Sequence, residues 1–345
     1  MTTKMSTNIL LVGGGVTSAI LSKLLSSEIG KLKITVWEKQ KFVGGRFYTS
    51  ETYLGDTKYS LDLGAQYITT NDETMQQNSD IYESLLKSEA LVNKKLNIKG
   101  LKPMLDRTNF FAPNGMSSIV EYLFKDSRVE NIFCDCELEK LSSKDCKWEA
   151  CSSSGKIELF DVVVLTIPIP EFFKIDGDLT KTIQSDISSN LSSVKYSSRY
   201  AVGLLFESPL TTEFDSEYIY HSDTFRFVAF DSWRQSNTGI ANSAMLHSTV
   251  QFGEENPTHT KELEEKILNS INVEFPHWPK PVVTRFHRWD QSQVQEPYNS
   301  KPGAVVLSEK PLLIMGGDGF VGSTFDQCLF SAKKIFNLLK CETQH

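Results

Sequence analysis

The sequence predicts a two-lobed α/β protein, with one lobe built around a parallel sheet and the other around an antiparallel sheet. Near-continuous β-branched or aliphatic runs at 161–167 and 312–315 suit strands that are buried on both faces of a parallel sheet. Alternating runs at 200–206, 225–231 and 244–250 are typical of antiparallel strands with one face in a core. At 345 residues the chain is long enough to form both lobes.

The N-terminal segment predicts a Rossmann-like βαβ unit. A strand, a glycine turn, a helix and a second strand follow one another at 8–12, 13–15, 16–26 and 33–37. In such a unit Gly13 permits the tight turn, and Gly15 lets backbone N–H groups approach a diphosphate at the positive end of the helix. Ser18 stands where a third glycine is usual, so we expect looser packing of helix on strand. By itself this turn is weak evidence for a nucleotide site.

Two later features favour FAD as the nucleotide. Glu38 closes the second strand, where a carboxylate can accept both hydroxyls of an adenosine ribose. In Gly44-Gly45-Arg46 the glycines let the chain pass close to a diphosphate, which the guanidinium can bind bidentately. Alone, the carboxylate would be a solvated charge and the glycines a simple turn. Together, in this order, these features are typical of FAD folds rather than NAD folds.

A glycine-rich loop near the C-terminus, Gly316-Gly317-Asp318-Gly319-Phe320, predicts the flavin end of the site. Its backbone N–H groups can meet the N1–C2=O edge of a flavin, where negative charge collects on reduction. Asp318 can accept a hydrogen bond from a ribityl hydroxyl. Capping of the last strand by glycines is an equally good interpretation of this loop alone. We expect the two chain ends to converge on one FAD molecule.

Charge and hydropathy argue against several classes of partner. Lys and Arg number 36 against 43 Asp and Glu, and the formal net charge of −7 disfavours nucleic acid and anionic membranes. The apolar runs are too short to span a bilayer, and the run at 9–12 is too short for a secretory signal. We expect a cytoplasmic monomer, with export by a nonstandard route left open.

The cysteine pattern predicts reduced thiols and no metal site. Six cysteines in a chain of this length suit a reducing compartment better than a disulfide framework. Cys134 and Cys136 form a C-x-C pair, but no second pair has zinc spacing. Two thiols along a strand are the simpler interpretation.

Blocks spread over nearly the whole chain resemble the renalase family, in that family's order. These blocks are residues 44–46, 62–69, 164–171, 196–201 and 316–320. Renalases belong to the wider flavin amine oxidase-like group. The resemblance therefore implies a p-hydroxybenzoate hydroxylase-like fold, with a Rossmann-like FAD-binding lobe and an antiparallel-sheet substrate lobe.

The same resemblance implies an FAD oxidase. The family oxidises the 2- and 6-dihydro isomers of NAD(P)H by hydride transfer to flavin N5. Dioxygen then re-oxidises the flavin, giving hydrogen peroxide and NAD(P)+. By this resemblance Thr17, Arg46, Gln66 and Tyr67 occupy positions that contact FAD, and Leu138 matches the aliphatic residue beside the adenine.

His247 and Tyr67 are the candidates for the substrate pocket. His247 shares a strand face with Met245 and Thr249, and the resemblance places a histidine near the flavin at this position. The alternatives are a sheet histidine without a role and a core aromatic. Only one glycine fingerprint exists, so we expect a nicotinamide substrate to enter the cleft between the lobes. It would be held mainly by its ring, with little discrimination between NAD and NADP. Hydride transfer needs alignment more than an acid or a base, so no catalytic residue is identified.

Two other functions remain open. A flavin amine oxidase shares both FAD segments but usually has a lysine bridged to flavin N5 and two facing aromatic residues. The run at 321–325 lacks that aromatic pattern. A binding or signalling protein with a structural FAD is the other alternative, and the retained Gly-Gly-Arg and C-terminal loop argue against it.

The expected lobes interleave along the chain. The FAD-binding lobe is expected to comprise residues 1–72, 108–190 and 300–345. The substrate lobe is expected to comprise residues 73–107 and 191–299.

Overall fold

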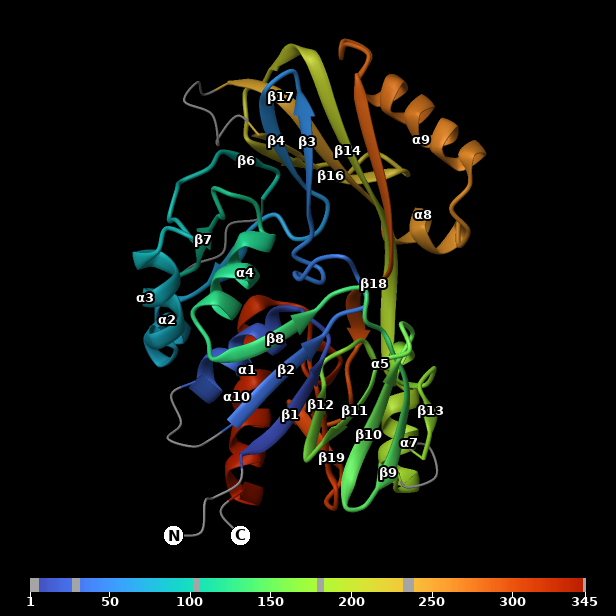
Figure 1. The fold of residues 1–345 in the computed structure, drawn as a ribbon. Helices are drawn as coiled ribbons and strands as arrows, with labels where there is room; N and C mark the ends of the chain where they lie inside the picture. The colour runs from blue at the N-terminus through green and yellow to red at the C-terminus, as the bar shows by residue number, and fades with distance from the viewer. Residues whose placement is uncertain (1–5, 27–31, 102–105, 179–182, 232–238, 344–345) are drawn as a thin grey trace. The chain divides into compact units, whose positions relative to one another are not determined.

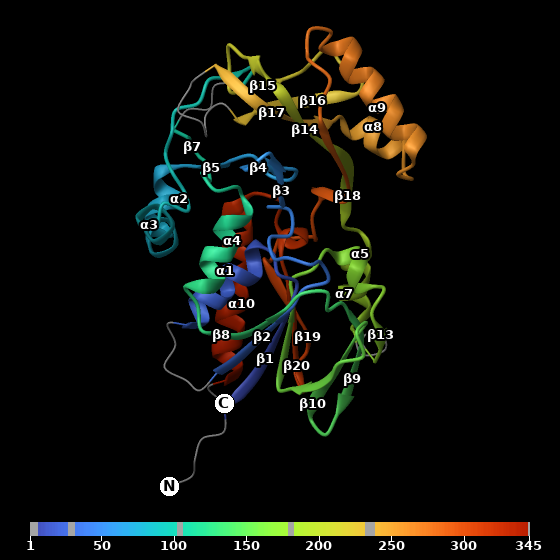
Figure 2. The same ribbon diagram turned by 45° about the horizontal axis from the view of Figure 1, so that its top comes forward.

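The chain divides into two compact units, which Figures 1 and 2 show as ribbons. The structure is a computed structural model that describes residues 6–26, 32–101, 106–178, 183–231 and 239–343. The first unit comprises Met1–Gly45, Ser117–Lys195 and Val294–His345. The second unit comprises Arg46–Met116 and Tyr196–Gln293.

A six-stranded sheet forms the centre of the first unit, in the order β19-β20-β12-β1-β2-β8. All neighbouring pairs are parallel except β19 with β20. In chain order the strands are β1 (Thr7–Val12), β2 (Leu32–Trp37), β8 (Val129–Phe133), β12 (Val162–Leu165), β19 (Ala304–Ser308) and β20 (Leu312–Gly316). Every residue of β12 and β20 is buried, as expected for strands covered on both faces.

Helices cover one face of this sheet and a smaller sheet covers the other (Figure 2). The helices, which pack on one another, are α1 (Val16–Ser26), α4 (Ser117–Lys125) and α10 (Phe325–Thr343). The smaller sheet, in the order β11-β10-β9-β13, contains β9 (Leu138–Lys144), β10 (Lys147–Ser152), β11 (Ile157–Phe160) and β13 (Asp176–Gly177). Short helices α5 (Ile169–Phe172) and α7 (Ser185–Ser192) follow β12 and β13 respectively. The first unit is therefore three-layered.

The second unit contains another six-stranded sheet, in the order β18-β14-β17-β16-β15-β6. Its strands are β6 (Ile98–Lys99), β14 (Lys195–Thr211), β15 (Ser216–Tyr218), β16 (Phe225–Phe230), β17 (Ile240–Ser248) and β18 (Val283–Glu296). Around it lie the hairpin β3 (Thr49–Leu54) and β4 (Thr57–Asp62), the pair β5 (Ile68–Thr70) and β7 (Thr108–Phe110), and helices α2 (Asp72–Gln77), α3 (Ser79–Lys87), α8 (Val250–Glu255) and α9 (Lys261–Glu274). The strands at 200–206, 225–231 and 244–250 predicted from alternation correspond to β14, β16 and β17.

Alternation gives this second sheet two different faces. One face packs with Phe252 of α8 and with Leu263, Ile267 and Ile271 of α9 in a large apolar core. The opposite face carries a smaller cluster of Leu61, Leu63, Ala201, Phe227 and Met245, against which Tyr48, Tyr67, Tyr218 and Trp289 pack. We call this opposite face the aromatic face.

The division of the chain requires a correction to the expected lobe boundaries. Residues 46–72 and 108–116, expected in the FAD-binding lobe, lie in the second unit. The reason is that Leu61 and Leu63 pack on the aromatic face and that β5 pairs with β7. Residues 191–195 and 294–299 instead lie in the first unit, where the Tyr298 N–H donates to the Gly319 carbonyl at 2.8 Å.

Within the described residues, no helix is both long and apolar enough to cross a membrane.

Candidate cofactor and substrate sites

Three loops of the first unit meet at one edge of the parallel sheet. Val12 of β1 pairs in register with Leu165 of β12, which in turn pairs with Met315 of β20. Since parallel strands end at the same edge, the loops that follow these residues are neighbours, and ligands of open α/β sheets bind at that edge. The loops begin at Gly13, Thr166 and Gly317, so the expected convergence of the two chain ends is present within the first unit.

Thr166 connects these loops, a role that the sequence analysis did not identify. Its hydroxyl donates to the Val12 carbonyl at 3.0 Å and lies 2.8 Å from the Ser18 hydroxyl of α1. A Cβ atom added to Gly317 would lie 3.5 Å from the Thr166 carbonyl oxygen, so the C-terminal loop passes close to Thr166. Ser18 is fully buried, so this serine does not loosen the packing of α1 as expected but joins it to the loop after β12.

The glycines of the first loop form a cradle with open space beside α1. Gly13 has a φ of +100°, which permits the tight turn. The Gly44 N–H donates to the Gly14 carbonyl at 2.9 Å, and a Cβ on Gly45 would lie 3.3 Å from the Gly15 Cα. A Cβ on Gly15 would meet no atom within 4 Å. The space at the N-terminus of α1 therefore fits a diphosphate, which the helix dipole and the backbone N–H groups favour.

Glu38 is fixed beside this cradle by the backbone. One of its carboxylate oxygens accepts from the Gly14 N–H at 2.6 Å and the other from the Gln40 N–H at 2.7 Å. The side chain is only 6% exposed, and this burial raises the pKa of the carboxyl group despite these hydrogen bonds. A carboxylate has about four acceptor positions. The backbone hydrogen bonds leave part of this capacity free, so the geometry fits an acceptor for ribose hydroxyls.

Thr17 and Leu138 lie close to the same elements. Thr17 is buried in the first turn of α1. Leu138 is a buried residue at the start of β9. The chain just before Leu138 is joined to the end of β2, because the Cys136 N–H donates to the Glu38 carbonyl at 2.9 Å.

The C-terminal loop offers its backbone rather than its side chains. Gly317 has a φ of +118°. Asp318 is buried and accepts a hydrogen bond from the Ser323 hydroxyl at 2.7 Å. The Phe320 ring is fully buried and stacks on Tyr298, with ring centroids 5.2 Å apart. Since both side chains already have contacts within the unit, backbone groups of residues 317–319 are the better candidates for a flavin contact.

Three predicted FAD residues belong to the second unit. The Arg46 guanidinium lies 6.0 Å from the centroid of the Tyr196 ring. Gln66 donates its side-chain amide to the Gly64 carbonyl at 3.0 Å. A Cβ on Gly64 would lie 1.9 Å from the Arg46 carbonyl oxygen, so this close passage of two backbone segments requires glycine. Tyr67, the third, lies on the aromatic face.

Tyr67 and His247 lie on the aromatic face with partners that fix them. The Tyr67 and Tyr218 hydroxyls are 2.5 Å apart, and burial together with this hydrogen bond raises the pKa of Tyr67. The His247 Nε2 donates to the Leu63 carbonyl at 3.2 Å, and the Trp289 Nε1 donates to the same oxygen at 2.8 Å. Burial lowers the pKa of His247 to about 4, so this imidazole is neutral at pH 7.

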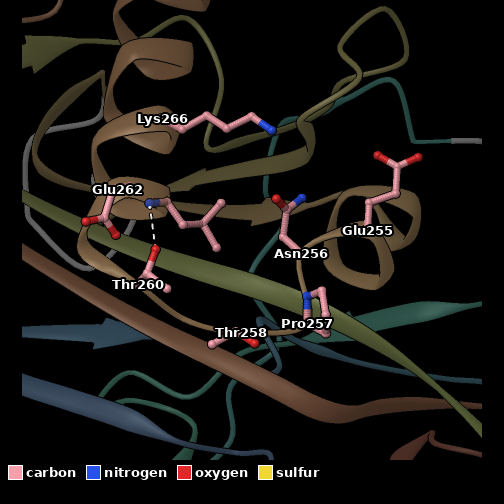
Figure 3. Close-up of a pocket in the computed structure, with 8 residues that line it drawn as sticks. Glu255, Asn256, Pro257, Thr258, Thr260, Glu262 and Lys266 are labelled. Atoms are coloured by element: carbon pink, nitrogen blue, oxygen red, sulfur yellow. Dashed lines mark hydrogen bonds between the residues drawn. The ribbon is translucent and has the colours of Figure 1, made fainter.

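A shallow hollow lies elsewhere in the second unit, at the ends of α8 and α9 (Figure 3). It has a volume of about 360 Å³, and the Leu263 N–H donates to the Thr260 hydroxyl at its edge. The lining residues are Glu255, Asn256, Pro257, Thr258, Thr260, Glu262, Leu263 and Lys266. None of the residues predicted to bind the cofactor or the substrate is among them.

Comparison with known proteins identifies the family. A model of the flavin containing amine oxidoreductases matches residues 103–303, and a model of the NAD(P)-binding Rossmann-like domain matches residues 11–84. Renalase of Mus musculus is 32% identical over 338 residues, which cover 96% of this chain and 98% of the mouse protein. The chain belongs to the renalase family. It is therefore an FAD-dependent oxidoreductase, and the family predicted from the sequence is confirmed.

Solved structures confirm the fold class of this renalase-family chain. A candidate protoporphyrinogen oxidase from an Exiguobacterium species has a TM-score of 0.73 at 12% identity, covering 98% of this chain and 99% of that one. Putrescine oxidase bound to putrescine has a TM-score of 0.68 at 10% identity, with coverage of 98% and 99%. At these identities the likeness concerns the fold alone.

Proposed function

We propose that the chain oxidises the 2- and 6-dihydro isomers of NAD(P)H through its FAD and passes the electrons to dioxygen. The products are NAD(P)+ and hydrogen peroxide. The aromatic face of the second unit is the observation that carries this proposal, because it combines closely packed aromatic rings with a neutral histidine. Such a surface suits a flat, uncharged dihydronicotinamide ring.

The first unit holds the cofactor in this proposal. Backbone N–H groups at Gly15 and the start of α1 bind the diphosphate, and Glu38 accepts from the hydroxyls of the adenosine ribose. Thr17 and Leu138 line the adenosine end. The backbone of residues 317–319 meets the flavin edge at the other end, with Thr166 holding the two loops together.

The bound flavin supplies a hydride acceptor at N5 and returns the electrons to dioxygen. The chain supplies orientation and a dry surface. Tyr67 is fixed by Tyr218 and His247 by Leu63, so the face is preorganised before the substrate binds. A hydride leaves with its electron pair and the oxidised ring needs no proton transfer. A neutral His247 is therefore sufficient, and no general base is required.

An anaerobic spectrum tests this proposal. The purified, FAD-loaded protein is mixed without oxygen with equilibrated isomers of NADH, or with putrescine or a catecholamine. We expect the isomers alone to bleach the flavin absorbance rapidly, and admission of oxygen to restore it with one peroxide per turnover. Rapid bleaching by the amines and none by the isomers would instead identify an amine oxidase. A flavin that no compound reduces would support a structural role for FAD.

A further inference from the structure

A β-bulge in the second unit sets the position of Arg226 at the edge of the aromatic face. Phe225 of β16 pairs with Ser248 of β17, while Phe227 pairs with the adjacent His247, so Arg226 is the extra residue. Phe225 consequently packs in the large core and Phe227 in the aromatic face. Bulges of this kind redirect a side chain and are common next to binding sites.

Two aromatic rings and a carbonyl group hold the Arg226 guanidinium in place. Its carbon atom lies 4.1 Å from the Tyr220 ring centroid and 5.3 Å from that of Tyr218, whose hydroxyl contacts Tyr67. Its Nη1 donates to the Ile219 carbonyl at 3.1 Å. A planar cation on aromatic rings keeps other N–H groups for a ligand, since a guanidinium has five donors.

A second guanidinium, that of Arg199, binds Ser248, the β17 residue that pairs with Phe225 next to Arg226. Arg199 stands on β14 two residues before Ala201, which pairs with His247, and its Nη1 donates to the Ser248 carbonyl at 3.0 Å. Burial and the charge of Arg226 lower the pKa of Arg199. The charge of Arg199 in turn contributes to the lowered pKa of His247.

The pair has an excess of positive charge. Among the described residues, neither Arg199 nor Arg226 forms an ion pair with a carboxylate, although the charge of Glu254 contributes to the electrostatics of Arg199. Two like charges in partly buried positions repel each other, and an oxyanion between them would offset both the repulsion and the desolvation.

We propose that Arg199 and Arg226 bind the diphosphate of the dinucleotide substrate, beside the surface that takes its dihydronicotinamide ring. This inference rests on the proposed function, because it identifies the phosphate end of the same substrate. Arginine forks match phosphate oxygens bidentately, and two of them suit a group with two phosphates. The diphosphate is common to NAD and NADP forms. The pair therefore adds affinity without distinguishing them, in accord with the weak discrimination expected from the sequence.

Calorimetric titration of FAD-saturated protein with ADP-ribose tests the site independently of turnover. The variants are R199Q and R226Q, with R285Q as a control because Arg285 is exposed on β18. We expect each of the two variants to raise the Kd for ADP-ribose by about tenfold or more, R285Q to leave it unchanged, and added salt to weaken wild-type binding. R199K and R226K, which keep the charge, should recover part of the affinity. Binding of ADP-ribose to R199Q and R226Q as tightly as to wild type would overturn the proposal.

Anaerobic flavin bleaching separates this site from the ring-binding face. Isomers of NADH are compared with isomers of dihydronicotinamide riboside, which lack phosphate. We expect R226Q to raise the half-saturating concentration of the NADH isomers only, with the saturating rate kept within about twofold. Equal weakening of both compounds would mean that the arginines only support the fold. Arginine-dependent binding of ADP-ribose without bleaching by any isomer would retain the anion site and refute the proposed function.

Discussion

Gly15 and Gly64 illustrate how the same residue type is required for different reasons. Gly15 faces open space, so an alanine there fits the protein but fills the space proposed for the diphosphate. We expect Gly15→Ala to change the free energy of unfolding of the FAD-free protein by less than about 1 kcal/mol and to raise the Kd for FAD about tenfold or more. Gly64→Ala is the contrasting variant, because its Cβ would lie 1.9 Å from a backbone oxygen, and we expect it to unfold at lower temperature. Unchanged FAD affinity in Gly15→Ala would remove the diphosphate from this turn.

Arg46 is proposed to bind the FAD diphosphate by a charge-assisted hydrogen bond. We expect Arg46→Ala to weaken FAD binding by about 1 to 3 kcal/mol, measured from the fluorescence of released FAD. The exposed Arg285→Ala should retain the wild-type affinity. Full FAD retention by Arg46→Ala would assign its guanidinium to packing on Tyr196 alone.

His247 makes stability depend on pH in a defined window. Burial lowers its pKa from 6.5 to about 4, so the unfolded chain binds a proton between these values that the folded chain does not. The free energy of unfolding should therefore fall as the pH drops from 6.5 towards 4, with His287, whose pKa burial also lowers to about 4, adding to the fall. We expect His247→Gln to reduce this fall in urea titrations across that range. The exposed His277→Gln is the control substitution. Identical pH profiles for His247→Gln and wild type would show that the histidine titrates normally.

At the scale of elements, the contact between α1 and the loop after β12 joins the front of the chain to its back. The Ser18 and Thr166 hydroxyls share one partly buried hydrogen bond, and Thr166 also donates to the carbonyl at the end of β1. We expect Thr166→Val to lower the free energy of unfolding by about 1 to 3 kcal/mol, because it removes the hydrogen-bond partner of the buried Ser18 hydroxyl. In a double-mutant cycle with Ser18→Ala, the two losses should not add. Strict additivity would mean that the hydroxyls act independently.

The elements that the sequence predicted correctly are those with strong local patterns. The buried strands β12 and β20 and the glycine turn after β1 can each be predicted from a few consecutive residues, namely an apolar run or adjacent glycines. The lobe boundary was wrong at residues 46–72, because the packing of Leu61 and Leu63 on a distant strand leaves no local signal.

The site residues that sequence reasoning missed depend on contacts between distant segments. Thr166 could have been found, since it follows a buried strand whose carboxyl end must reach the ligand-binding edge. The Tyr218 partner of Tyr67 and the bulge at Arg226 could not, because both depend on the strand register of the folded sheet.

At the scale of the whole molecule, the two ends of the chain are proposed to build one cofactor site. The order of strands in the first sheet places β20, from the end of the chain, one strand away from β1, with β12 between them. The strand order thus brings the loops at residues 13–15 and 317–319 to the same sheet edge, and the family supplies FAD as the cofactor. Neither loop alone would hold both ends of an extended dinucleotide.

Hydrogen–deuterium exchange with and without FAD tests this central claim most directly. At one FAD per chain, we predict that amide exchange slows together in the segments around residues 13–17 and 317–321, with the same dependence on FAD concentration. Slowing at only one of these segments, or no uptake of FAD at all, would contradict the account.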